Sequence, residues 1–154
     1  MEFDRYRQLV GGRFAAQQMT PMGAALYYEE RFEAKWIFTK LKQFSFLAQA
    51  EQATAEQLAR YSAQCLEYAL SGAPGLPRGL QNGVVSFSVL AAPEVTEDAV
   101  AFARSRPKKH FAAFEVPVLA DLTAGRLYYY DKTPLWGAIY YKYFRQYIEK
   151  SFGF

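Results

Sequence analysis

A run of basic residues stands directly before the most apolar segment of the chain. It consists of Arg104, Arg106, Lys108, Lys109 and His110, with no acidic residue between Ala99 and Phe114. Positive side chains at the end of a strand suit a phosphate or carboxylate group, and α/β folds bind ligands in the loops at their strand ends. The run could therefore form an anion-binding site, but most such runs are solvated turns, which is the interpretation that we favour.

His110 and Glu115 are the residues of this region that could exchange a proton with a ligand. Glu115 lies inside the apolar segment, where a carboxylate needs either a raised pKa or a cationic partner, for which a nearby Lys or Arg is expected. His110 is the only histidine, and the acidic residues around it show no ligand spacing. The sequence therefore predicts no metal site.

Two residues far apart in the sequence complete the expected ligand site. Arg78 lies between Pro77 and Gly79 in a loop rich in glycine and proline, where a rigid backbone could present its guanidinium to an anion. Trp136 follows the run Tyr128-Tyr129-Tyr130 and could stack on a planar ligand or on a partner chain. The predicted ligand-binding set is Arg78, Lys108, Lys109, His110, Glu115 and Trp136.

No combination of residues forms a recognisable catalytic set. Cys65, the only cysteine, falls on the apolar side of an expected helix, so we expect a buried structural thiol and no disulfide. Nucleophile-elbow, P-loop and dinucleotide-binding spacings are all missing. Glu33-Ala34-Lys35 has the acid-x-Lys form of many metal-dependent nuclease strands, but three residues match by chance too easily. We predict no cofactor and favour a protein without enzymatic activity.

The composition limits the classes of protein to which this chain can belong. With 154 residues, 51% of them hydrophobic and 21% charged, the chain can form one globular domain with a real core, residues 1–154. A net charge of +3 is far below the strongly basic balance of a nucleic-acid binder, so we do not expect nucleic acid as the main partner. The N-terminus does not resemble a signal peptide and no stretch is long enough to span a bilayer, so we expect no membrane partner and a cytoplasmic location.

Aromatic residues are frequent, with 12 Tyr, 13 Phe and 2 Trp. One small core has limited room for so much aromatic area, so part of it is expected on a surface that meets a partner. We therefore favour a non-enzymatic binding protein that self-associates, most simply as a homodimer. Two alternatives stay open: an enzyme or sensor for a small anionic ligand that bears phosphate or carboxylate, and a weak nucleic-acid binder.

The segment from Phe111 to Tyr130 is expected to form the hairpin that organises the domain. Residues 111–122 are apolar at nearly every position, as in a strand with layers on both faces, whereas Pro117 favours a sheet edge or a bulge. Thr123-Ala124-Gly125 predicts a tight turn, in which Gly125 can adopt a positive φ. Residues 127–130 are strongly β-prone and complete the hairpin.

Periodicity and capping signals assign the remaining elements. They are a helix over 54–70, a strand over 84–91, a helix from Thr96 to about Arg104, and a last helix opened by Thr133-Pro134. Thr54 and Gln57 have the spacing of a capping box. Residues 2–18 have helical spacing, although Gly11-Gly12 would also suit a hairpin turn. Residues 31–49 fit either a strand or a helix, and their aromatic content favours a strand, especially from Trp36 to Leu47.

These elements give the order α-β-α-β-α-β-β-α in a single α/β or α+β domain. We expect a mixed sheet of about four strands, parallel except for an antiparallel C-terminal hairpin, with helices on both faces. The order resembles the thioredoxin-like fold, in which a proline adjoins the third strand as Pro117 does here. The resemblance concerns topology only, because the family's C-x-x-C is missing and its redox activity does not carry over.

Overall fold

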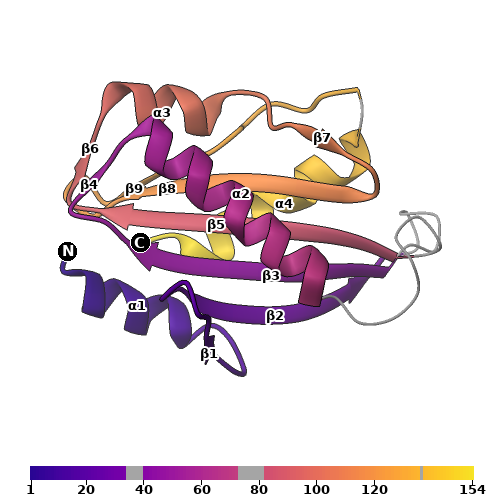
Figure 1. Cartoon of the computed structure of the whole chain (residues 1–154), viewed down its shortest axis with the longest axis horizontal. Helices are drawn as coiled ribbons and strands as arrows, with labels where there is room; N and C mark the ends of the chain where they lie inside the picture. The colour runs from indigo at the N-terminus through magenta and orange to yellow at the C-terminus, as the bar shows by residue number, and fades with distance from the viewer. Residues whose placement is uncertain (34–39, 73–81, 136) are drawn as a thin grey trace.

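The computed structural model describes residues 1–33, 40–72, 82–135 and 137–154 (Figure 1). These residues form a single α/β domain, and none of their helices is both long and apolar enough to cross a membrane. The helices are α1 (Phe3–Gly11), α2 (Ala55–Gly72), α3 (Glu97–Arg104) and α4 (Ala138–Phe152). The strands are β1 (Gln18–Met19), β2 (Ala25–Phe32), β3 (Lys40–Gln49), β4 (Gln52–Ala53), β5 (Asn82–Ala92), β6 (Glu94–Val95), β7 (Lys109–His110), β8 (Ala113–Asp121) and β9 (Arg126–Tyr128).

Within the described part of the chain, seven strands form one mixed sheet. Its order is β1-β2-β3-β5-β8-β7, and β9 also pairs with β8. β2 runs antiparallel to both β1 and β3, whereas β3, β5 and β8 run parallel to one another. β7 and β9 pair antiparallel with the two ends of β8, and β4 and β6 form a separate parallel pair.

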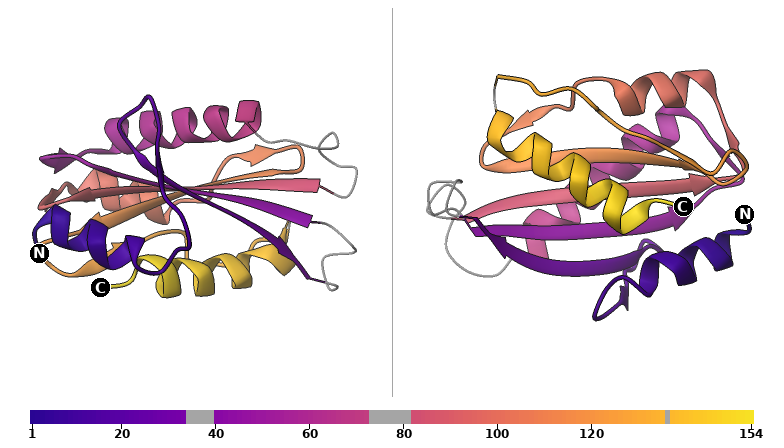
Figure 2. Two further views of the ribbon diagram at one scale, coloured as in Figure 1. Left: turned by 90° about the horizontal axis from the view of Figure 1, so that it is seen from below. Right: turned by 180° about the vertical axis from the view of Figure 1, so that it is seen from behind.

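Helices cover both faces of the sheet, as expected. α2 and α3 lie on one face, and α1 and α4 lie on the other (Figure 2). The larger core lies under α4, where the rings of Phe87, Phe114 and Phe144 meet with centroids 5.0 and 5.5 Å apart. Tyr6 of α1 is fully buried and donates a 2.6 Å hydrogen bond to the carbonyl oxygen of Phe152, which links the first helix to the last.

The capping signals are confirmed at both helices of the α2 face. Thr54 donates its N–H to the Gln57 side chain at 3.1 Å and accepts the Gln57 N–H on its hydroxyl at 3.3 Å. The Thr96 hydroxyl accepts the N–H of Ala99 at 3.3 Å. Each helix therefore begins where its side chains satisfy the first backbone donors.

The C-terminal hairpin is also confirmed. β8 is buried along almost its whole length because helices cover it on both faces. Gly125 has a φ of 64°, the left-handed conformation that the turn requires. The Asp121 carboxylate accepts the N–H groups of Thr123 and Ala124 at 3.0 and 2.9 Å, which fixes this turn.

The sheet has more strands than the sequence pattern indicates. β1, β7 and β9 contain only two or three residues, too few for an alternating pattern. The sequence did not predict β2. Tyr28–Phe32 are all exposed, so their sequence does not alternate between apolar and polar residues as in a half-buried strand. β3 confirms the strand interpretation for the second half of residues 31–49, while Trp36 lies outside the described residues.

The last helix begins later than Thr133-Pro134 indicates. Pro134 belongs to the preceding loop, and α4 starts at Ala138 after Gly137, which has a φ of 74°. A Cβ atom on Gly137 would lie 3.1 Å from the Phe114 ring. Close packing on β8 therefore sets the start of this helix, and the proline signal is wrong here.

We expect the Phe144→Ala variant to lose about 3–5 kcal/mol of unfolding free energy, because Phe144 is 1% exposed and its removal leaves a cavity among aromatic rings. Denaturant unfolding followed by circular dichroism measures the loss. Ile139→Ala, on the same helix but 46% exposed, is the matched control and should cost less than about 1 kcal/mol. Equal losses in the two variants would contradict the packing of α4 described above.

Candidate functional site

The structure brings together two of the predicted site residues, His110 and Glu115. The His110 Nε2 atom lies 2.9 Å from the Glu115 Oε2 atom. This contact arises because His110 of β7 pairs with Ala113 of β8, and Glu115 follows two residues later on the same face. The Glu115 side chain is only 10% exposed and that of His110 is 30% exposed. The partner of the buried carboxylate is therefore the imidazole, where the sequence suggested a Lys or Arg.

The remaining predicted site residues are placed differently. Lys108 and Lys109 are exposed, and Arg78 and Trp136 lie outside the described residues. The basic run enters at the amino end of β8, which runs parallel to β5. Ligands in α/β sheets usually bind at the carboxyl ends of the strands. The structure shows the His110–Glu115 pair, and the complete ligand site stays a prediction.

Cys65 of α2 lies near the buried side of Glu115. Burial raises the pKa of the Cys65 thiol to about 12; the neighbouring Tyr61 hydroxyl opposes this shift, and the Glu115 carboxylate adds to it. A thiol with such a pKa is protonated at neutral pH, whereas a cysteine nucleophile reacts as the thiolate. The expected burial of Cys65 is confirmed, and His110 is engaged by Glu115.

Buried hydroxyl groups surround this cluster without hydrogen-bond partners among the described residues. They belong to Ser62, Ser86 and Ser88, while the Tyr61 hydroxyl lies beside the Cys65 thiol. Ser86 pairs in register with Glu115, so this polar layer lies between α2 and the two central strands. A buried hydroxyl without a partner is unfavourable compared with an apolar side chain of similar size.

Cys65 should resist thiol-specific reagents such as DTNB as long as the protein is folded. The thiol is fully buried, and its raised pKa leaves almost no thiolate at neutral pH. Absorbance should show no reaction in buffer and complete reaction of the single thiol in denaturant. Rapid labelling of the native protein would show that α2 opens from the sheet, contrary to this expectation.

Removing the His110 imidazole should destabilise the fold, because it leaves the Glu115 carboxylate buried without its partner. We expect His110→Ala to lower the unfolding free energy by about 1–3 kcal/mol. Lys108→Ala, an exposed neighbour, should change it by less than about 0.5 kcal/mol. In a double-mutant cycle, Glu115→Gln should remove most of the His110→Ala effect. If His110→Ala costs no more than Lys108→Ala, the pair does not stabilise the protein.

The outer edge of β2 is a second candidate site. β1 pairs only with Ala25 and Leu26, and no described strand pairs with the outer edge of Tyr28–Phe32. All residues of this segment are exposed, and the Tyr28 and Phe32 rings are 38% and 53% exposed. The segment therefore presents a row of backbone N–H and C=O groups flanked by two aromatic side chains.

A groove of about 420 Å³ lies beside this edge on the α2 face. Leu26, Tyr28 and Phe44 line it as apolar residues, and the Tyr28 and Phe44 rings lie 4.8 Å apart. Gln17 and Gln18 contribute polar side chains to its lining. The groove thus offers apolar area with a few hydrogen-bonding groups, the usual make-up of a binding site.

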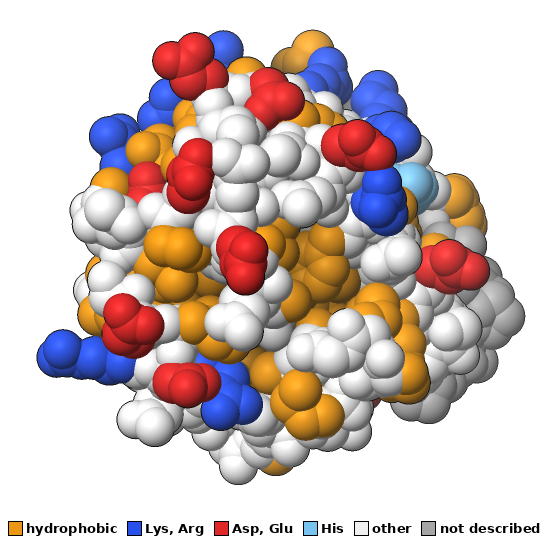
Figure 3. Space-filling model, turned by 60° about the vertical axis from the view of Figure 1, so that its left-hand side comes forward, with side chains coloured by type: hydrophobic (Ala, Val, Ile, Leu, Met, Phe, Trp, Pro, Cys, Tyr) orange, Lys and Arg blue, Asp and Glu red, His pale blue; other side chains and the backbone are white. Residues whose placement is uncertain are grey.

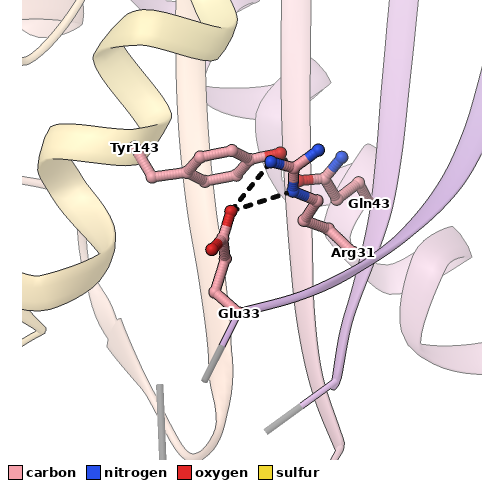
Figure 4. Close-up of polar contacts among 4 residues, drawn as sticks. All are labelled: Arg31, Glu33, Gln43 and Tyr143. Atoms are coloured by element: carbon pink, nitrogen blue, oxygen red, sulfur yellow. Dashed lines mark hydrogen bonds and ion pairs between the residues drawn. The ribbon is translucent and has the colours of Figure 1, made fainter. Parts of the chain in front are cut away.

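The opposite face of β2 is fixed by a polar network with β3 and α4 (Figure 4). Arg31 makes hydrogen bonds of 2.8 and 3.1 Å to Glu33 and lies 5.8 Å above the centre of the Tyr143 ring. Tyr143 donates a hydrogen bond to Gln43. Glu29 lies on the same face, within 3.4 Å of the Tyr147 hydroxyl. These contacts hold β2 in place, while no strand of the described ranges covers its outer edge beyond Leu26.

The other edge of the sheet is covered. β7 pairs with Ala113 and Phe114 of β8, and β9 pairs with Leu119–Asp121. Pro117 lies in the gap between the two and has no N–H to offer another strand. The two edges therefore differ in the described part of the chain: short strands pair with both ends of β8, whereas no described strand covers Tyr28–Phe32 of β2.

Charge does not single out an anion-binding surface in the two places considered next. On the face shown in Figure 3, acidic side chains are scattered among hydrophobic ones, and the visible Lys and Arg side chains lie mainly at the margins. A recess of about 330 Å³ contains Arg104 and Arg126. Their guanidinium carbons lie 5.1 and 5.3 Å from the centre of the Tyr128 ring. Asp131 and Glu149 line the same recess and balance these charges. Neither feature favours an anionic partner.

Sequence reasoning did not identify the β2 edge, although part of its signal is visible. Tyr27-Tyr28 and Phe32 are β-prone residues on both sides of a charged triplet, Glu29-Glu30-Arg31. This pattern is consistent with an edge strand, because charged residues are common at sheet edges. Whether the edge is paired depends on distant segments and cannot be read from the local sequence.

No family model matches this chain, and comparison with curated proteins and with solved structures finds no detectably similar protein. The assignment of a function therefore depends on the geometry described above. Of the candidate sites, the β2 edge combines accessible backbone groups, exposed aromatic rings and an adjoining groove.

Proposed function

We propose that this protein is a non-enzymatic binding protein that takes up an extended polypeptide segment along the outer edge of β2. The observation that carries the proposal is the exposed edge Tyr28–Phe32, which no described strand covers. Unpaired backbone groups along a sheet edge are a template for strand addition, in which main-chain hydrogen bonds give affinity and side-chain pockets give specificity.

The groove beside Tyr28 supports an extended chain as the ligand. Leu26 and Tyr28 lie on one face of β2, so alternate side chains of an added strand would project over the groove. The added strand would extend the line of β1, which already runs antiparallel to β2 at Ala25 and Leu26. A small molecule could fill the groove but would leave the backbone groups of the edge unused.

No observation favours a second function. An anionic ligand at His110 and the neighbouring lysines would compete with Glu115, which already engages the imidazole at 2.9 Å. Small-anion binding and nucleic-acid binding therefore stay predictions from the sequence. The cytoplasmic location and the thioredoxin-like topology also stay predictions, and the proposal requires neither.

Peptides selected from a random library against the folded protein test the proposal. We expect them to carry apolar residues at alternate positions and to slow amide hydrogen exchange at residues 28–32 on binding. The Tyr28→Ser/Phe32→Ser variant should bind these peptides at least about tenfold more weakly, because it removes both exposed rings of the edge.

A matched control separates this site from general loss of exposed apolar area. Leu9→Ser/Ile139→Ser removes side chains that are 37% and 46% exposed, close to the 38% and 53% of Tyr28 and Phe32. Its peptide affinity should equal that of the wild type. The proposal fails if no peptide is selected, if both double variants bind alike, or if the protection from exchange lies away from β2.

A further inference from the structure

We propose that the strand that β2 receives is β2 of a second copy of this chain. The inference rests on the proposed function and identifies its partner. The two strands pair antiparallel about a two-fold axis that passes beside Glu30, so that Glu30 faces Glu30 of the second copy. Glu29 then faces the second copy's Arg31, and Tyr28 faces the second copy's Phe32.

Strand geometry limits the possible registers. Along β2 the backbone N–H and C=O groups point alternately towards β3 and towards the outer edge. In a two-fold pairing, a residue that points outwards must meet one that also points outwards. The sum of the two paired residue numbers is therefore even, which leaves pairings centred on Glu29, Glu30 or Arg31.

Charge distinguishes these three registers. Centring on Glu29 places two Glu29 carboxylates opposite each other, and centring on Arg31 places two guanidinium groups opposite each other. Only the register centred on Glu30 sets each Glu29 against an Arg31. Cross-strand side chains lie about 4.5–5.5 Å apart at Cβ, so this pairing adds two opposite-charge contacts on the α4 face, where Arg31 already bonds Glu33 of its own copy.

The same register matches the aromatic side chains on the α2 face. Each Tyr28 ring would lie opposite a Phe32 ring, and both are exposed in the single chain. The register also fits the space along the edge. It ends at Tyr28, whereas centring on Glu29 would bring the second copy's Phe32 opposite Leu26, where Gln18 of β1 already pairs.

The Glu30 pair at the axis is compensated within each copy. The Lys40 Nζ atom lies 2.9 Å from the Glu30 Oε2 atom, and the Tyr28 hydroxyl donates to Oε1 at 2.8 Å. Lys42 of β3 pairs in register with Glu30 and adds positive charge nearby. Two carboxylates therefore meet together with at least two lysines, and the axis carries no net negative charge.

The segment Tyr28–Phe32 spans about 17 Å, which is a short strand pair. An interface of this size is typical of weak, concentration-dependent dimers rather than obligate ones. We expect the dimer to form in the micromolar range or above and to weaken as salt screens the Glu29–Arg31 pairs.

Charge reversal tests the partner and the register together. Glu29→Arg alone and Arg31→Glu alone each create two like-charge contacts, and sedimentation should show dimerisation weakened by about tenfold or more. An equimolar mixture of the two variants should form a heterodimer, because all its cross-strand contacts are then of opposite charge. The Glu29→Arg/Arg31→Glu double variant should dimerise like the wild type. Circular dichroism confirms that each variant is folded.

Cysteine cross-linking reads the register directly. In the proposed register, two copies of the Glu30→Cys variant form a disulfide with each other on mild oxidation, because the paired Cα atoms lie about 4.5–5.5 Å apart, within disulfide range. Two copies of the Glu29→Cys variant should not cross-link, and neither should two copies of Arg31→Cys. In a mixture, one copy of each variant should cross-link with one copy of the other. The native Cys65 does not interfere, since it is fully buried.

The outcomes separate this inference from the proposed function. The protein could stay monomeric at high concentration and still bind selected peptides at β2. That result would support the proposed function and would overturn the inference that the partner is a second copy. Self-linkage of Glu29→Cys or Arg31→Cys, or failure of the charge-reversed mixture to associate, overturns the register. Loss of both peptide binding and dimerisation would overturn both proposals.

Discussion

The parallel pairing of β3, β5 and β8 is the constraint on which the rest of the structure depends. Parallel neighbours cannot be joined by a short turn, so the chain must cross over the sheet between them. α2 and α3 make these two crossings and lie on the same face (Figure 2). The other face is left for the helices at the two ends of the chain, α1 and α4. The central strands are therefore buried on both sides, and β2 is left at the margin of the sheet.

This arrangement places β8 near one edge of the sheet and β2 near the other, and the two strands differ in how far their outer edges are paired. Beyond β8, two short strands and Pro117 leave little backbone available for another chain. Beyond β2, β1 pairs with only two residues, and no other described strand continues along this edge. The polar network around Arg31 and Tyr143 holds β2 firmly against β3 and α4. A rigid strand with an exposed edge loses little conformational entropy when a further strand is added.

The aromatic content has a different explanation from the one that composition suggests. Tyr141, Phe144, Tyr147 and Phe152 of α4 are all buried in the core under that helix. Self-association through the last helix is therefore not supported by a large exposed aromatic face there. Tyr28 and Phe32 are exposed aromatic residues that support a partner surface, on a strand that the composition did not distinguish, while Phe111 is exposed elsewhere.

The sequence alone determined the features that depend on short-range interactions. The capping box of Thr54, the turn at Gly125 and the apolar β8 strand are encoded by residues within a few positions of one another, and each is confirmed. The pairing of His110 with Glu115 could be anticipated only in part, since its hydrogen bond depends on the register of β7 on β8.

Only the tertiary structure decided which segments lie next to one another. The start of α4 depends on the contact of Gly137 with Phe114, and the exposure of Tyr28–Phe32 depends on where β1 leaves the sheet. The first is a contact between two separate elements, and the second is set by the three-dimensional path of the chain before β2, so the local pattern records neither. The backbone of β2 has the same chemistry whether or not a strand lies beside it, so its availability for binding is a property of the assembled sheet.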